Sequence, residues 1–234
     1  MIQADQVSKS YLRGEDQVHA LQTATFGVQP GEFVAVIGPS GSGKSTLLSM
    51  LGGMLSPTAG RIVLDGESLY DVSIEKRAAL RNHKIGFVFQ NFNLIPWLNA
   101  LENVELPLRL YGHDRKSRRT AATELLERFG LVDRILHRPS ELSAGQQQRV
   151  ALARMLATNP RLILADEPTG NLDSETRDLV VETLSELCNE DRAVVLVTHD
   201  DAVSTTASRV LQISDGLVTE QRNQKERPGK NAVA

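Results

Sequence analysis

Short, mainly apolar segments alternate with segments of helical periodicity along much of the chain. Residues 32–37, 161–165 and 193–197 are apolar runs with the length of a buried strand. The segment between the last two runs places three apolar side chains on one helical face: Val180, Leu184 and Leu187. Strands that are buried on both faces belong to parallel sheets, so the alternation predicts an α/β fold with a largely parallel core sheet covered by helices.

Two regions depart from that alternation. Residues 22–28 and 61–64, the second followed by Asp65-Gly66, have the pattern of antiparallel strands and a turn. Between about residues 73 and 142 the helical patterns cluster instead, as at Ala122, Leu125, Leu126 and Phe129. We therefore expect an antiparallel β subdomain and a helical lobe at about 73–142 that is inserted into the α/β core.

Length and composition fit a single domain of ordinary globular character. The chain has 234 residues with 41% hydrophobic content, and we expect a domain at 1–220 and a disordered tail at 221–234. Its 26 basic and 29 acidic residues give a net charge of -3, which provides no general attraction to nucleic acid or anionic lipid. No apolar run is long enough for direct membrane insertion. Cys188 is the only cysteine, which favours a reducing compartment and a core-filling role.

Residues 38–45, GPSGSGKS, form the most informative motif. They fit G-x-x-x-x-G-K-[ST] between an expected strand and a helix at 44–51. The glycines let consecutive backbone N–H groups point at a phosphate chain, and the helix adds its positive end. We expect Lys44 to reach the β- and γ-phosphates and the Ser45 hydroxyl to bind Mg²⁺. The expected nucleotide contacts are Gly38, Pro39, Ser40, Gly41, Ser42, Gly43, Lys44, Ser45 and Thr46.

Asp166 and Glu167 end the apolar run at 161–165 and are candidates for catalysis. Because successive side chains of a strand point to opposite faces, the two acids need not share a role. We expect Asp166 to hold Mg²⁺ through its water shell and Glu167 to orient the water that attacks the γ-phosphate.

His199 and Gln90 also follow expected strands. His199 comes after 193–197, at the carboxyl edge of a parallel sheet where ligands bind, and is a candidate γ-phosphate contact. Gln90 closes the strand-like run 84–89, and its amide could touch both Mg²⁺ and the attacking water. Taken alone, both positions are also explained as strand-end residues without a catalytic role.

Residues 142–149, LSAGQQQR, resemble the signature motif of ATP-binding-cassette (ABC) ATPases. Most of the chain resembles that family in the order and spacing of its motifs. Tyr11 matches the aromatic loop that stacks on adenine, Gln90 the glutamine loop, residues 170–173 the D-loop and His199 the switch histidine. One departure is Ala144, where the family usually has glycine. Its methyl group raises the question of how closely a nucleotide could approach the backbone there.

The residues around the signature predict a second anion site. We expect a helix at 146–158, and Ser143 and Gly145 precede its N-terminus. The resemblance implies a P-loop NTPase that binds ATP with Mg²⁺ and hydrolyses it. It further implies a homodimer formed on ATP binding, in which each signature closes the other subunit's site through Ser143, Gly145, Gln146 and Asp173. The partner would be an integral membrane permease, which places the chain in the cytoplasm, peripheral on the cytoplasmic face of the inner membrane.

The strings EPTGNLD at 167–173 and LSAGQQQRVALAR resemble the lipoprotein-release and macrolide-export group, which also includes a cell-division member. An amino-acid importer ATPase is the alternative within the family, although its D-loop more often begins with serine-alanine. A soluble ABC ATPase acting on ribosomes or DNA is a further alternative, but such proteins carry two cassettes or a long coiled coil. A G protein is disfavoured because no N-K-x-D string is present. The transported substrate and its direction should depend on the permease.

The loop at 91–98, NFNLIPWL, is unusually apolar for a connection. It contains Phe92 and the only tryptophan, Trp97, and Pro96 keeps it from forming a regular helix or a central strand. Such a loop either folds under the helical lobe or receives a partner. The resemblance to ABC ATPases favours a groove for a cytoplasmic helix of the permease.

Overall fold

The computed structural model describes residues 1–14 and 16–222, which form two compact units. The first unit contains Met1–Asp71 and the chain from Ser185 onward, and the second contains Val72–Leu184. The second unit is therefore an insertion in the sequence of the first. Strand β10 extends through Arg222, and the rest of the expected tail lies outside the described residues.

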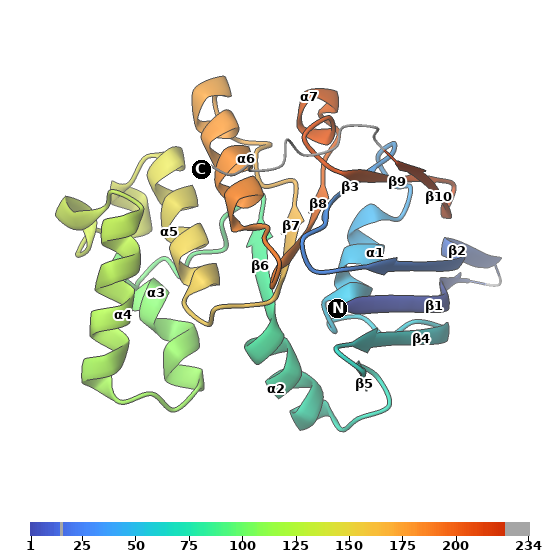
Figure 1. Ribbon diagram of the computed structural model, residues 1–234, viewed down its shortest axis with the longest axis horizontal. Helices are drawn as coiled ribbons and strands as arrows, with labels where there is room; N and C mark the ends of the chain where they lie inside the picture. The colour runs from blue at the N-terminus through green and yellow to red at the C-terminus, as the bar shows by residue number, and fades with distance from the viewer. Residues whose placement is uncertain (15, 223–234) are drawn as a thin grey trace, which may run out of the picture. The chain divides into compact units, whose positions relative to one another are not determined.

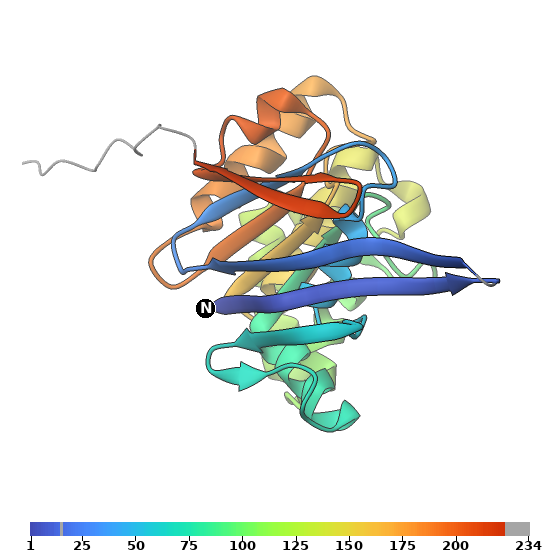
Figure 2. The same cartoon turned by 90° about the vertical axis from the view of Figure 1, so that its right-hand side faces the viewer.

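An antiparallel sheet in the first unit has the strand order β2-β1-β4-β5. Its strands are β1 (Ile2–Arg13), β2 (Asp16–Val28), β4 (Ala59–Leu64) and β5 (Glu67–Ser68). β1 and β2 form the long two-stranded ribbon that is seen in Figure 2. Asp65 and Gly66 have left-handed backbones, with φ angles of 50° and 82°, as the tight turn between β4 and β5 requires.

The first unit also contains four strands of a second sheet. They are β3 (Phe33–Ile37), β8 (Ala193–Val197), β9 (Arg209–Ser214) and β10 (Leu217–Arg222). β3 pairs in parallel with both β8 and β9, and β10 pairs antiparallel with β9. All side chains of β8 and nearly all of β3 are buried, which explains their unbroken apolar sequences. Helix α1 (Lys44–Leu51) follows β3, and the short helix α7 (Asp201–Ser204) follows β8.

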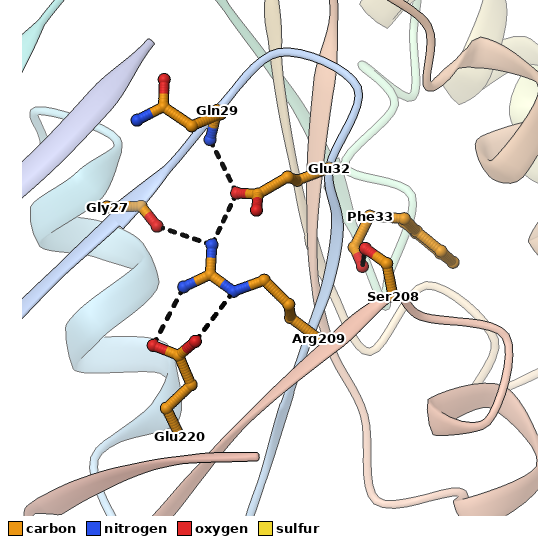
Figure 3. Close-up of polar contacts among 7 residues, drawn as sticks. All are labelled: Gly27, Gln29, Glu32, Phe33, Ser208, Arg209 and Glu220. Atoms are coloured by element: carbon orange, nitrogen blue, oxygen red, sulfur yellow. Dashed lines mark hydrogen bonds and ion pairs between the residues drawn. The ribbon is translucent and has the colours of Figure 1, made fainter. Parts of the chain in front are cut away.

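A charged network centred on Arg209 of β9 joins β10, β2 and the residue that precedes β3 (Figure 3). Arg209 donates through Nη1 to Glu32 Oε2 at 2.6 Å and to the carbonyl oxygen of Gly27 at 2.9 Å. Its Nε and Nη2 meet the two carboxylate oxygens of Glu220 at 3.1 and 3.0 Å. Glu32 also accepts the backbone N–H of Gln29. Burial opposes the charged form of Arg209, but its bonds and attraction to Glu220 and Glu32 raise its pKa above the ordinary value.

The second unit combines two parallel strands with a helical cluster. Its elements are α2 (Ile74–Lys84), β6 (Ile85–Phe89), α3 (Ala100–Leu110), α4 (Arg115–Arg128), the 3-10 turns Val132–Arg134 and Pro139–Glu141, α5 (Ala144–Leu156), β7 (Leu162–Asp166) and the start of α6 (Ser174–Leu187). β6 and β7 pair in parallel. Helices α3, α4 and α5 lie side by side (Figure 1) around one core: Ala100, Leu101, Val104, Ala122, Leu126, Leu131, Leu142, Val150 and Ala153.

Side chains cap the start of each long helix between α2 and α5. Ser73, Asn99, Asp114 and Ser143 each accept a backbone N–H from the first turn of the helix that follows. Asp114 caps α4, whose first residues are a mainly exposed basic run, RKSRR at 115–119. These caps satisfy N–H groups that would otherwise need water or a ligand.

The predicted fold class is confirmed, with differences in detail. β2 begins at Asp16 rather than at residue 22, because its outer half is exposed and lacks an apolar pattern. The hairpin of β9 and β10 was not predicted, although Asp215-Gly216 gives the same turn signal as Asp65-Gly66. Cys188 is buried, as expected. Within the described residues, the helices are too short or too polar to cross a membrane.

Candidate active site

The phosphate loop joins β3 to α1 and surrounds the side chain of Lys44. Gly38, Gly41 and Gly43 have φ angles of 151°, 78° and 109°, which residues with a Cβ rarely adopt. Lys44 is only 7% exposed, and its Nζ donates to the carbonyl oxygens of Gly38 at 2.9 Å and Pro39 at 2.8 Å. The ammonium group therefore lies inside the loop that the sequence predicted.

Two other strands of the first unit hold this loop from outside. A Cβ on Gly38 would lie 2.1 Å from the carbonyl oxygen of Ile213 in β9. A Cβ on Gly43 would lie 2.1 Å from the carbonyl oxygen of Ala20 in β2. Glycine is thus required at both positions by close backbone approach as well as by φ.

The N-terminus of α1 differs from those of α2, α3, α4 and α5 because, in the part of the chain that the structure describes, no side chain caps it. Its N-cap is Gly43, whose backbone is left-handed. Nearby, Ser42 Oγ is buried and has no hydrogen-bond partner among the described residues. Backbone N–H groups at a helix start and a buried hydroxyl suit a phosphate group, so these residues fit the phosphate chain of a nucleotide. Of the other expected contacts, Pro39, Ser40, Gly41 and Ser45 are exposed and Thr46 is half-buried.

Tyr11 lies near the outer end of β1, opposite Val18 of β2. Its side chain is 43% exposed, and the ammonium group of Lys9 lies 5.2 Å from the ring centre. An exposed aromatic face on a strand is suited to stacking against a flat ligand.

His199 follows β8 and is exposed. The preceding residue, Thr198, is buried and donates its backbone N–H to the carbonyl oxygen of Val36 at 3.1 Å. Thr198 Oγ1 also accepts the N–H of Asp200 at 3.0 Å. These bonds fix the turn that carries His199 beside β3, the strand that leads into the phosphate loop.

Asp166 and Glu167 lie at the end of β7 in the second unit. Asp166 is the last strand residue, whereas Glu167 leaves the strand with a left-handed backbone, φ 45°. We expected the two side chains to point to opposite faces because both would lie on one strand. That argument does not apply, because Glu167 is outside the strand. A non-glycine residue keeps this conformation only where its surroundings fix it. Here Gln148, a fully buried residue of α5, donates from Nε2 to the carbonyl oxygen of Pro168 at 2.9 Å.

Gln90 follows β6 and lies against the segment after Glu167. A Cβ on Gly170 would lie 2.7 Å from Gln90 Nε2, so the amide packs against bare backbone. Asn171 Nδ2 donates to the carbonyl oxygen of Gln90 at 3.2 Å and to Asn91 Oδ1 at 3.2 Å. The second unit thus brings Gln90 together with the chain that follows the two acids.

The signature segment forms the start of α5, which begins at Ala144 rather than at the expected residue 146. Ser143 Oγ accepts the N–H of Gln146 at 3.3 Å, and Gln146 Oε1 accepts the N–H of Ser143 at 3.0 Å. This capping box places Gly145 inside the first turn. Ala144 is exposed and is not among the residues with a positive φ, so alanine fits there without backbone strain.

Asp173 and the signature residue Gly145 both lie next to Thr176. Asp173 accepts the backbone N–H of Thr176 at 3.0 Å and its hydroxyl at 2.8 Å. These bonds, the backbone one first, hold the pKa of Asp173 below its ordinary value. A Cβ on Gly145 would lie 3.0 Å from Thr176 Cγ2, so little room separates the D-loop from the signature.

Residues 21–170 match the family described as ABC transporter. The chain is also 45% identical over 218 residues to the uncharacterized ABC transporter ATP-binding protein YknY of Bacillus subtilis, covering 93% of this chain and 95% of that protein. The chain belongs to the ABC transporter family. It is therefore an ATP-binding subunit that hydrolyses ATP, and the resemblance seen in the signature is confirmed.

Two further ABC proteins refine this assignment. The macrolide export ATP-binding/permease protein MacB of Syntrophobacter fumaroxidans is 47% identical over 222 residues, covering 93% of this chain but 31% of that protein. The solved dimeric structure of the ATP-binding cassette MJ0796, a Methanocaldococcus jannaschii protein, in a post-hydrolysis state bound to ADP and Pi has a TM-score of 0.88 and 43% identity. The structural match covers 95% of this chain and 98% of the MJ0796 chain. These ABC relatives confirm the P-loop fold and support the export-type group over the importer alternative.

The expected site residues of this ABC protein are divided between the two units. The first holds Tyr11, Gly38 to Thr46 and His199, and the second holds Gln90, Ser143, Gly145, Gln146, Asp166, Glu167 and Asp173. The contacts that Gln148 and Asn171 make were not predicted from the sequence. Helical spacing offered one signal, because Gln148 shares a face with the buried residues Leu152 and Met155 and so needs a polar partner.

Proposed function

We propose that this chain drives a separate integral membrane permease by hydrolysing Mg²⁺-bound ATP in a homodimer. The observation that carries the proposal is the uncapped start of α1, with Lys44 buried inside a glycine loop. Lys44 would exchange the carbonyl oxygens of Gly38 and Pro39 for phosphate oxygens. Tyr11 would stack on the adenine ring through its exposed face.

The residues of the second unit would carry the hydrolytic step. Glu167 orients and polarises the attacking water, and Gln90 holds that water with its amide. His199, from the first unit, donates a hydrogen bond to the γ-phosphate. Mg²⁺, when bound, neutralises charge on the phosphates, and Ser45, Asp166 and Gln90 are the residues that would hold it.

The signature would act on the nucleotide of a second subunit. Ser143, Gly145 and Gln146 lie at the positive end of α5, which would suit a phosphate that the second subunit's own glycine loop already holds. Asp173 would join this contact. The dimeric state of the ABC cassette MJ0796 supports the arrangement.

The loop at 91–98 would meet the permease through Trp97. Trp97 is 72% exposed, whereas Phe92 is 9% exposed and belongs to the core. These exposures support a loop that packs into the fold through Phe92 and leaves Trp97 available to a partner. The name of MacB joins an ATP-binding part to a permease, which supports an export-type partner at the cytoplasmic face of the membrane. The chain would attach there peripherally.

Glu167→Gln tests the catalytic proposal. Removing a group that orients the attacking water should lower turnover about a hundredfold or more. The variant should still bind ATP and should accumulate as a dimer, which light scattering with and without ATP would detect. The matched control is Glu175→Gln, an exposed carboxylate in the first turn of α6, which should keep wild-type turnover. Turnover near wild type in Glu167→Gln would remove Glu167 from the mechanism.

An ATP titration that measures the dissociation constant tests the role of Tyr11. Because stacking is worth about 1–3 kcal/mol, Tyr11→Ala should raise the ATP dissociation constant several-fold while Tyr11→Phe has a mild effect. Equal affinities in both variants and the wild type would dismiss the stacking role.

Two substitutions test the permease contact. Trp97→Ser should fold normally and keep basal ATPase activity but lose stimulation by permease-containing vesicles. Phe92→Ser should instead lose several kcal/mol of stability, because a polar side chain replaces a buried ring. Full stimulation of Trp97→Ser would defeat the proposed contact.

A further inference from the structure

The turn after Gln90 has an unusual backbone. Phe92 and Asn93 are consecutive residues with left-handed φ angles of 59° and 49°. The turn is tight, since Asn93 donates its N–H to the carbonyl oxygen of Asn91 at 2.6 Å. Two such residues in succession persist only where other groups hold them, so the restraints on this turn set the direction in which Gln90 leaves β6.

Arg154 of α5 supplies the main restraint. Its Nη1 donates to the carbonyl oxygen of Asn93 at 2.6 Å, and its Nη2 donates to that of Phe92 at 2.7 Å. The planar guanidinium reaches both carbonyls at once, which the single ammonium group of a lysine does not reproduce. Burial lowers the pKa of Arg154, and no carboxylate among the described residues bonds to it. A cation placed among backbone carbonyls fixes their geometry without a salt bridge.

The helix that carries Arg154 is itself firmly packed. Arg154 lies about three turns along α5 from the N-cap Ser143. Its neighbours Val150 and Ala153 belong to the core shared with α3 and α4. Two short charge-assisted bonds therefore tie the turn to α5, so that a shift of this helix would displace the turn.

The other side of the turn is closed as well. Gln90 packs against the backbone of Gly170, and Asn171 bonds to the Gln90 carbonyl oxygen. With this side occupied, the clamp of Arg154 on Phe92 and Asn93 leaves the Gln90 amide few alternative positions.

We propose that Arg154 is a positioning residue that sets the Gln90 amide for hydrolysis. The inference rests on the proposed function, in which Gln90 holds the attacking water. Arg154 touches no reacting atom in this scheme and acts only through the backbone of Phe92 and Asn93. It makes the helix that starts at the signature also the element that aligns Gln90.

The test is a mutant cycle on the full-length protein in steady-state ATPase assays with Mg²⁺. Arg154→Met should lower kcat about tenfold while the KM for ATP stays within about twofold, because a misplaced group loses turnover rather than binding. Arg154→Lys, which keeps the charge but not the fork, should lie between Arg154→Met and wild type. In a Gln90→Ala background, Arg154→Met should cause little further loss, because both changes remove the same contribution. Thermal unfolding of each variant confirms that assays are run on folded protein.

Arg118→Met is the matched control. Arg118 also donates through Nη1 to a backbone carbonyl, that of His113 at 2.7 Å, but it lies in α4. This variant should keep wild-type kcat at the assay temperature. If Gln90→Ala lowers kcat and Arg154→Met lowers it by the same factor in both backgrounds, the inference about Arg154 is overturned while the proposed function stands. If Gln90→Ala keeps wild-type kcat, the role of Gln90 in the proposed function fails, and the inference falls with it. Wild-type kcat in Arg154→Met also overturns the inference.

Discussion

The two helix starts that carry the nucleotide motifs, those of α1 and α5, are built in opposite ways. The start of α1 has a left-handed glycine as its N-cap and no cap from any side chain that the structure describes. The start of α5 is closed by the reciprocal bonds of Ser143 and Gln146. Both helix ends offer positive charge to a phosphate, but the N-cap of α1 is a glycine, which has no side chain that could accept the first N–H groups.

The difference has a physical reason in the surroundings of each helix. The loop before α1 is held between β2 and β9, so close that a Cβ on Gly43 or Gly38 would collide with a backbone oxygen. A site held this way is ready before its ligand arrives and loses little entropy on binding. At the start of α5, Ser143 and Gln146 satisfy each other's backbone N–H groups. This helix start is therefore stable without a ligand and would bind a phosphate only when another chain brings one. In the proposed function, α1 would therefore hold the phosphate first, and α5 would contact it only in the dimer.

Matched glycine substitutions should separate the two helix starts most strongly. Gly43→Ala forces a Cβ to 2.1 Å from the Ala20 carbonyl oxygen at a φ of 109°, and should lose about 3 kcal/mol or more of stability. In Gly145→Ala the nearest atom to the new Cβ is Thr176 Cγ2, a side-chain atom at 3.0 Å, and alanine favours helix by about 1 kcal/mol, so stability should change by no more than about 1 kcal/mol. Urea unfolding measures both. Equal stability of the two variants would show that the glycine loop is not held as described.

Substitution of one polar contact at each start should separate binding from dimer formation. Lys44→Ala removes a buried charged donor and should weaken ATP binding by a monomer about a hundredfold, equivalent to about 3 kcal/mol. Ser143→Ala should leave that affinity within about twofold but lose about 1 kcal/mol of stability with its cap. Calorimetric titration with ATP at concentrations that keep the protein monomeric checks both. A large loss of monomer affinity in Ser143→Ala would mean that the signature acts on its own chain's nucleotide.

Sequence reasoning was most successful where one local pattern determines structure. Fully buried strands such as β3 and β8 read as apolar runs, and the glycine loop follows from a motif whose spacing is fixed. It was least successful where partners are backbone atoms far along the chain. Arg154 contacts the carbonyl of a residue 61 positions away, and any residue type carries a carbonyl. The left-handed backbone of Glu167 was also beyond reach, because a glutamate gives no local signal for that conformation.

The smallest expected effect comes from Gln146→Glu, and it separates the two roles of the α5 start. Glutamate can complete the same capping box and adds a negative charge at a helix N-terminus, so stability should hold or rise by about 0.5 kcal/mol. A phosphate that approaches from a second subunit would meet that same charge, so ATP-driven dimer formation should weaken several-fold by like-charge repulsion. The control Gln146→Ala should behave in reverse, losing about 0.5 kcal/mol with its half of the box while adding no repulsion. Thermal unfolding and light scattering in the Glu167→Gln background measure the two quantities separately. If Gln146→Glu forms dimers at the same ATP concentration as the wild type, the phosphate of the second subunit does not approach this helix end. The proposal that α5, like α1, binds a phosphate would then be wrong.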